Sequence, residues 1–292
     1  MNIGLVYAAL AFAIWGLFPL YIRQLATVSP VEIVLHRSVW SLVFVLIVLS
    51  ALRRWSWIGE VWRDPRRIRV FAVSALLLAV NWLVYVYAVN SNRVVDASLG
   101  YFINPLVNVM LGVLVLHERL RRPQWVAVGL AATGVLWLTL LTGQLPWIAL
   151  VLALSFGTYG LLRKTASLGA LEGLALETFL LAPLVVPWLL WWTWQHGGAL
   201  TRGDATLTFW LVAAGPLTAL PLLLFAAGAR RLPLATVGLM QYLGPSIQLA
   251  LGIWVFHEPF DSRRLVGFAL IWSALAVYSL DGWRVSRRPA TA

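Results

Sequence analysis

Residues 97–118 read ASLGYFINPLVNVMLGVLVLHE, and residues 235–258 read ATVGLMQYLGPSIQLALGIWVFHE. Each stretch opens on small residues and has a proline near its middle. A glycine follows seven residues after the proline, and a His-Glu pair begins five residues after the glycine. Agreement in both residue type and spacing indicates an internal repeat rather than chance. The echo extends upstream, where the first half has Trp15-Gly16 and Val31-Glu32 and the second has Tyr159-Gly160 and Leu176-Glu177.

The repeat lies in a chain whose composition suits lipid rather than water. Of 292 residues, 61% are hydrophobic and 11% are charged, whereas a soluble domain carries about 25% charged residues. The apolar residues come in runs of about 20, the length with which an α-helix crosses about 30 Å of hydrocarbon. The runs are apolar on every face instead of alternating with a period of two, which argues against a membrane β-barrel. The sequence therefore predicts an all-α integral membrane protein whose helices satisfy their own backbone hydrogen bonds.

Prolines, glycine pairs and arginine clusters divide the chain into ten apolar segments. Each segment is long enough for one membrane crossing. We expect transmembrane helices at roughly 3–23, 31–52, 69–90, 95–116, 123–142, 146–163, 172–194, 206–229, 233–256 and 264–282.

The 22 lysines and arginines set the expected orientation. With a cytoplasmic N-terminus most of them fall in cytoplasmic segments, as the positive-inside rule requires, and Arg263-Arg264 is the local exception. An even number of helices then returns the C-terminus to the cytoplasm. The net charge of +11 is spread over short clusters between apolar runs. It therefore indicates membrane orientation, and we expect no nucleic-acid partner.

Ten helices divide into two repeats of five, at residues 1–142 and 143–283, followed by a cytoplasmic tail at 284–292. Five is an odd number, so the second repeat must cross the membrane upside down relative to the first. Inverted repeats of this kind are typical of secondary transporters, which bind their substrate near the midplane between the repeats. Scaffolds and membrane enzymes also arise by duplication, and these alternatives stay open at this point.

The chain resembles the RarD branch of the drug/metabolite transporter superfamily, whose halves are EamA domains. The likeness covers nearly the whole chain before about Arg284. This resemblance implies ten helices, two cytoplasmic termini and a central cavity in a permease of the bacterial inner membrane, with export as the expected direction. The residues that carry it are Ile14-Trp15-Gly16 with Pro19, Glu32 to Arg37, Asn81-Trp82, Ala88 to Ser91, Ala97 to Leu106, Glu118-Arg119-Leu120, Gly157 to Lys164, Gly215 to Pro221, and Gln241-Tyr242.

The second expected helix holds the densest set of polar residues at membrane depth: Glu32, His36 and Arg37, with Trp40 one turn further. Ionisable groups in lipid are costly unless they pair or face water, so they mark candidate functional sites. Glu32 and His36 are one helical turn apart and can hydrogen-bond each other. We interpret Glu32 and His36 as proton-coupling candidates. We also interpret His36, Arg37 and Trp40 as lining a substrate or anion site. The alternative is a structural network at the outer interface, in which Arg37 extends toward the headgroups.

The fourth and ninth expected helices each present polar residues at helical spacing. These are Tyr101, Asn104 and Asn108 in the fourth, and Gln241, Tyr242 and Gln248 in the ninth. Pro105 and Pro245 each remove a backbone donor, and we expect them to break or gate these helices. Such groups suit a substrate cavity, although Asn and Gln also form ordinary hydrogen bonds between helices.

Aromatic residues on three other expected helices complete the predicted cavity. Trp15 and Tyr159 occupy corresponding positions in the first and sixth helices, and Asn81 and Tyr85 share one face of the third. Aromatic walls with a few polar points suit an amphipathic solute, while core packing is the rival interpretation of each ring.

For two further acidic residues, Glu118 and Glu177, we expect structural roles. We expect Glu118 to cap or anchor its helix. Glu177 has no cationic neighbour in sequence, and we expect it to be protonated or to lie at the interface.

These features favour a secondary transporter of a small metabolite, an amino acid or an amphipathic drug. The chain has no Walker A motif, so it does not itself use ATP. It has no cysteine, and its four histidines are widely separated, so we predict no catalytic constellation, metal site or cofactor. A membrane-embedded enzyme and a non-transporting scaffold or sensor are the alternatives. The expected partners are the solute, the lipid bilayer and, in two open hypotheses, a coupled proton and a second copy of the chain.

Overall fold

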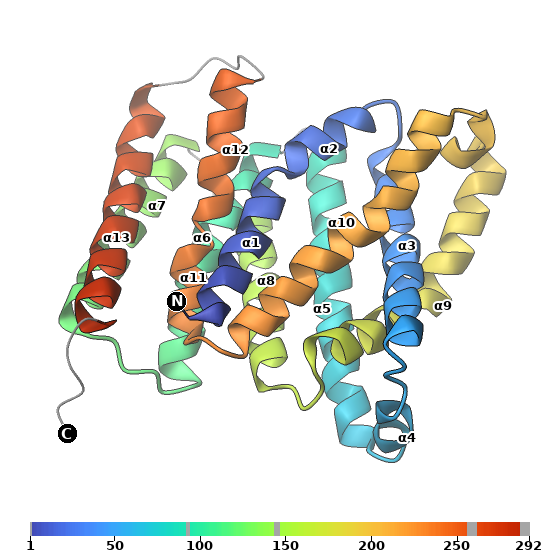
Figure 1. Ribbon diagram of the computed structural model, residues 1–292. Coiled ribbons are helices and arrows are strands. Elements are labelled where there is room, and N and C mark those ends of the chain that lie inside the picture. The colour runs from blue at the N-terminus through green and yellow to red at the C-terminus, as the bar shows by residue number, and fades with distance from the viewer. Residues whose placement is uncertain (1, 92–93, 143–146, 256–261, 287–292) are drawn as a thin grey trace.

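The computed structural model describes residues 2–91, 94–142, 147–255 and 262–286, and every regular element in these ranges is helical (Figure 1). The elements are α1 (Ile3–Gly16), α2 (Phe18–Gln24), α3 (Pro30–Ala51), α4 (Trp57–Trp62), α5 (Pro65–Asn90), α6 (Val94–Leu114), α7 (Arg122–Thr142), α8 (Trp147–Thr165), α9 (Ala170–His196), η1 (Ala199–Arg202), α10 (Ala205–Ala229), α11 (Leu234–Met240), α12 (Leu243–Trp254) and α13 (Ser262–Ser286).

Each of the ten apolar segments expected from the sequence falls on one helix or on two consecutive helices. Within the described residues, seven helical segments are long and apolar enough to cross a membrane, and the apolar part of α6, Gly100–Leu114, is shorter. The first and ninth segments are each divided, at Leu17 and at Gln241-Tyr242. Both breaks lie just before a proline, Pro19 or Pro245, which lacks the N–H that a continuous helix would use.

Pro105 has a different outcome, because α6 continues through it. Of the two prolines expected to break a helix, only Pro245 lies beside an interruption. The short helix α4 and the single turn η1 connect longer helices and were not expected from the sequence.

The helices pack as a bundle in which α1, α6, α8, α10 and α11 lie centrally (Figure 1). Helices α7 and α13 pack against each other at one edge, and α3 packs between α9 and α10 toward the other. Aromatic rings fill the centre: Phe225 of α10 lies 6.1 Å from Phe12 of α1 and 6.2 Å from Tyr159 of α8, measured between ring centroids. All three side chains are buried, so this aromatic cluster joins the two halves of the chain.

The outer surface of the bundle is strongly apolar. Large hydrophobic side chains on many helices are exposed, among them Leu140, Leu184, Leu190, Trp194 and Trp254. A soluble monomer rarely exposes contiguous apolar patches of more than a few hundred Å². The exposed side chains therefore face lipid, in agreement with the long apolar helices, and the chain is a multi-pass membrane protein.

Candidate functional site

Arg37 is the cation that the fold places among aromatic side chains. It lies seven residues after the first residue of α3, or about 10 Å along the helix axis at 1.5 Å per residue. Its Nε donates a hydrogen bond to Thr218 Oγ1 at 3.0 Å, and Thr218 lies near the middle of α10. This bond holds the guanidinium toward the centre of the bundle, which argues against extension to the headgroups.

Rings from several helices surround the Arg37 guanidinium. Its Cζ lies 4.8 Å from the ring centroid of Phe18 in α2 and 5.6 Å from that of Trp82 in α5. Both are within the range of a favourable cation–π contact. The hydroxyl groups of Tyr21, Tyr85 and Tyr101, on α2, α5 and α6, are close enough to interact with the charge. Helices α2, α5, α6 and α10 therefore all contribute to the environment of this one side chain of α3.

Several of these residues are not fully buried. Arg37 and Tyr85 are partly exposed, and Tyr101 is 42% exposed. Trp82 also lines a small apolar pocket between α3, α5 and α9, together with Ser38, Thr178 and Leu181. The predicted cavity residues Arg37, Tyr85 and Tyr101 are thus brought together, and Phe18, Tyr21, Trp82 and Thr218 join them.

Glu32 and His36 are both buried and lie near each other, as their spacing predicted. Glu32 Oε1 accepts a hydrogen bond from the backbone N–H of Ala199 at 2.6 Å. It lies 3.7 Å from His36 Nε2. Within the described residues neither ring nitrogen of His36 has a hydrogen-bond partner. Glu32 therefore ties the start of α3 to η1, and any change in its protonation would act on that link.

The polar residues of α6 and of the α11–α12 break mainly join helices. Asn108 Nδ2 donates to Gln241 Oε1 at 2.9 Å, and both side chains are buried. Tyr242 Oη donates to the carbonyl of Phe102 at 3.1 Å. Asn104 is buried, and its Oδ1 has no partner within the described residues. The rival interpretation of this set, hydrogen bonding between helices, thus has direct geometric support.

The remaining predicted site residues lie at three other places. Trp15 and Tyr159 belong to the central aromatic cluster, where Trp15 is partly exposed and Tyr159 fully buried. Gln248 Nε2 donates to the carbonyl of Trp15 at 3.1 Å. Asn81 Nδ2 donates to Leu152 O and Ser155 Oγ of α8, each at 2.9 Å. Trp40 is partly exposed, and its Nε1 is buried without a partner in the described part of the chain.

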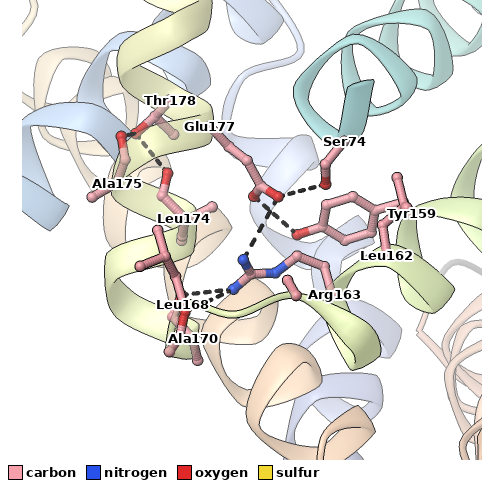
Figure 2. Close-up of polar contacts among 12 residues, drawn as sticks. Ser74, Tyr159, Leu162, Arg163, Leu168, Ala170, Leu174, Ala175, Glu177 and Thr178 are labelled. Carbon is pink, nitrogen blue, oxygen red and sulfur yellow. Dashed lines mark hydrogen bonds and ion pairs between the residues drawn. The ribbon is translucent and has the colours of Figure 1, made fainter. Parts of the chain in front are cut away.

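A second polar network, centred on Glu177 of α9, includes a cation that the neighbouring sequence did not indicate (Figure 2). Glu177 does not lie at the interface, since it is 0% exposed. Its Oε1 accepts from Ser74 Oγ at 2.5 Å and lies 3.7 Å from Arg163 Nη1, and its Oε2 accepts from Tyr159 Oη at 3.5 Å. The ion pair shows that the cation absent from the neighbouring sequence comes from another helix.

Arg163 was expected at the end of a membrane helix, in a cytoplasmic turn. Instead α8 continues to Thr165, and Arg163 is 1% exposed. Its Nη2 donates to the carbonyl of Ala170 at 2.8 Å, and its Cζ lies 5.7 Å from the ring centroid of Phe71. The guanidinium therefore joins α8, α9 and α5. The sequence does hold a signal for this pair. Glu177 is an acidic residue inside an apolar run, and Arg163 ends the preceding apolar run, on the other side of the loop between α8 and α9.

Glu118 caps a helix, as expected, but the helix is not its own. Its carboxylate accepts from the backbone N–H groups of Leu234 at 2.6 Å and Ala235 at 3.0 Å, in the first turn of α11. Lys164 Nζ lies 3.9 Å from the same carboxylate and donates to the carbonyls of Ala229 and Leu232. His117, with φ of 53°, turns the chain after α6 so that Glu118 reaches α11. The equivalent pair His257-Glu258 lies outside the described residues.

Comparisons with known proteins agree with a helical membrane transporter. The model of the EamA-like transporter family matches residues 2–140. An uncharacterised transporter of Pseudomonas aeruginosa is 50% identical over 285 residues, which cover 98% of this chain and 96% of that protein. A chain of known crystal structure superposes with a TM-score of 0.72 over 97% of this chain and 98% of that one. Its 17% identity makes this a likeness of fold alone.

The chain belongs to the EamA-like transporter family. Within that family it is a member of the RarD branch of the drug/metabolite transporter superfamily. The protein RarD of Streptomyces exfoliatus is 47% identical to it over 98% of this chain and 90% of that protein. The membrane transporter class and the branch suggested by the sequence motifs are thereby confirmed.

Proposed function

We propose that this protein is a secondary transporter that binds a small solute beside Arg37 and moves it across the membrane by alternating access. The observation that carries the proposal is a partly exposed charged side chain, fixed by Thr218 and surrounded by aromatic rings of other helices. We infer that these helices leave an opening beside it. Ionisable residues placed in this way mark substrate pathways in membrane proteins. Small metabolites, amino acids and amphipathic drugs are the solute classes that a pocket of aromatic walls and few polar groups suits.

The ten-helix architecture with two inverted repeats is part of the proposal, and the helix contacts support it. Pairing the helices in chain order makes α1 equivalent to α8, α3 to α9, α5 to α10, α6 to α11–α12, and α7 to α13. If the two repeats are related by symmetry, each contact between helices should have a counterpart between the equivalent helices. The contact of α6 with α8 then corresponds to that of α12 with α1. The contact of α3 with α10 likewise corresponds to that of α9 with α5, and all of these contacts occur. The family model also ends at residue 140, close to the proposed boundary between repeats.

Alternating access requires contacts that close each end of the bundle in turn. At one end Glu32 binds η1 and Arg202 Nη1 donates to the carbonyl of Thr27 at 3.2 Å. At the other end Glu118 and Lys164 join α6, α8 and the α10–α11 turn. Each group of contacts consists of a few hydrogen bonds that a rocking motion of one repeat could break.

We further propose that the protein lies in the bacterial inner membrane with both termini in the cytoplasm and that it exports its solute. The absence of cysteine makes orientation directly testable. Ser167, in the α8–α9 turn, and Thr206, in the first turn of α10, are both exposed. We expect Ser167→Cys to react with a membrane-impermeant maleimide only after cells are opened, and Thr206→Cys to react in intact cells. The reverse pattern, or equal labelling of both, would contradict the proposed orientation.

Transport itself is tested in proteoliposomes with a mixed panel of amino acids and amphipathic drugs, with and without a pH gradient. If Glu32 carries the coupled proton, Glu32→Gln should abolish the response to the gradient. The amide oxygen can still accept the bond from Ala199, so the link to η1 survives. His36→Ala should also reduce the gradient response. Equal flux with and without the gradient would rule out proton coupling, and an unchanged response in Glu32→Gln would exclude Glu32 as the carrier of the proton.

A further inference from the structure

Among the residues that the structure describes, the Arg37 guanidinium has no anionic partner. Its Nε is occupied by Thr218, and within the described residues no carboxylate pairs with it. The buried carboxylates of α3 and α9 are already engaged: Glu32 binds Ala199, and Glu177 binds Ser74 and Arg163. An arginine at membrane depth that is surrounded by rings and lacks an acidic partner is costly to maintain. A bound anion would compensate for that cost.

The geometry points to a carboxylate as that anion. With Nε bound to Thr218, the two terminal nitrogens of Arg37 remain available, and side by side they match the two oxygens of a carboxylate. A phosphate monoester carries a charge of about −1.5 to −2 at neutral pH, which a single cation compensates poorly. His36, the adjacent residue, lies 3.7 Å from the Glu32 carboxylate. The planar Arg37 guanidinium, with a single positive charge and two terminal nitrogens, therefore suits a planar ligand group with a single negative charge.

The surroundings of Arg37 define the rest of the ligand. Phe18 and Trp82 lie within 6 Å of the guanidinium carbon, at 4.8 and 5.6 Å, so a carboxylate bound there would hold its organic part against aromatic faces. The described neighbours offer hydroxyl groups, on Tyr21, Tyr85 and Tyr101, but no carboxylate that would pair with a ligand ammonium group.

We propose that the solute is an organic monocarboxylate with an aromatic or apolar body, that its carboxylate binds the terminal nitrogens of Arg37, and that it needs no α-amino group. This inference rests on the proposed function, because it names the solute class of the same site. Thr218 is then a positioning residue that aims the guanidinium into the opening.

The test measures binding rather than transport, so that its failure can be told from failure of the carrier mechanism. The purified protein in nanodiscs is titrated by calorimetry with benzoate, 3-phenylpropionate and indole-3-acetate, and with the matched primary amide of each. We expect at least one acid to bind, and its amide to bind at least about tenfold more weakly because the charge is lost. Phenylalanine and phenyl phosphate serve as the zwitterionic and phosphate comparisons. Both are expected to bind more weakly than 3-phenylpropionate.

Variants then assign the effect to Arg37. Arg37→Gln should weaken acid binding at least about tenfold while leaving amide binding unchanged, and Arg37→Lys should retain part of the affinity, since lysine keeps the charge but lacks the fork. Thr218→Val should produce a smaller loss than Arg37→Gln. The matched control is Arg119→Gln, which changes an exposed cation between α6 and α7. It should bind like the wild type.

Several outcomes would overturn the proposal. The ligand would be wrong if an acid and its amide bound equally, or if phenyl phosphate or phenylalanine bound more tightly than every acid. The site would be wrong if Arg37→Gln bound the acid as the wild type does. The proposal would also fail if the folded wild type bound none of the acids. Flux without any carboxylate binding would leave the carrier proposal standing and refute this one. Carboxylate binding without flux of any bound acid would do the reverse.

Discussion

Glu177→Leu is expected to destabilise the protein more than any other single substitution considered. It removes the carboxylate that pairs with Arg163 and accepts from Ser74 and Tyr159. Arg163 is 1% exposed and would be left as a buried charge without its counter-ion. Removing one partner of a buried ion pair typically costs about 3–5 kcal/mol. Unfolding in mixed micelles, followed by tryptophan fluorescence, measures the loss.

A double substitution separates the cost of the orphaned charge from the value of the pair. In Glu177→Leu/Arg163→Met both charges are replaced by apolar groups of similar size, which is often close to neutral for a buried pair. We expect the double variant to recover most, but not all, of the stability, because Arg163 also donates to Ala170 O. A double variant as unstable as the single one would show that packing, and not the unpaired charge, dominates.

The control for this series is Glu172→Gln on the same helix. Glu172 pairs at 3.4 Å with Arg54, whose side chain is 61% exposed. Pairs of that kind contribute less than about 1 kcal/mol. A loss in Glu172→Gln comparable to that in Glu177→Leu would mean that any charge change in α9 is damaging, and the argument from burial would fail.

Where the sequence anticipated the fold, it did so through the length of its apolar runs. The expected helix 31–52 became α3 at Pro30–Ala51, and 206–229 became α10 at Ala205–Ala229, since a membrane helix needs both an uninterrupted run and a capped or turning end. The break at Leu17 escaped prediction, whereas the break at Gln241-Tyr242 lies beside Pro245, which was expected to break its helix. An interruption of one or two residues changes the average hydrophobicity of a segment very little, so only the following proline signals it.

The sequence did not predict which side chains on different helices become partners. Arg163 stands next to Lys164 at the end of an apolar run, a pattern typical of a loop, and it is contacts with α5 and α9 that surround its guanidinium. Likewise Asn108 and Gln248 are equivalent by the repeat, yet the partner of Asn108 is Gln241. Equivalence in a repeat relates positions by symmetry and does not make them neighbours.

The same limit applies to the candidate solute site. Spacing along α3 identified Glu32, His36 and Arg37 together, but their neighbours divide them. Glu32 and His36 lie at the link to η1, while Arg37, on another face of the helix, meets α5 and α10. Phe18 and Thr218 had no distinguishing feature in the sequence, because an aromatic and a hydroxyl residue in an apolar helix are compatible with simple packing.

Gly215→Ala is the second substitution with a large expected effect, and it connects helix packing to the solute site. A Cβ at Gly215 of α10 would lie 2.3 Å from the carbonyl oxygen of Trp40 in α3, so backbone would have to move. Overpacking of this kind costs about 1–3 kcal/mol and occasionally more. Separating α3 from α10 would also lengthen the hydrogen bond between Arg37 and Thr218, which lies one turn beyond Gly215. We therefore expect Gly215→Ala to lower both stability in micelles and ligand affinity.

The control is Gly129→Ala, at an open helical position of α7. It should leave ligand affinity unchanged and raise stability by up to about 1 kcal/mol. Wild-type stability in Gly215→Ala would contradict the close approach of the two helices, and reduced stability with unchanged affinity would show that the Arg37 site does not depend on it.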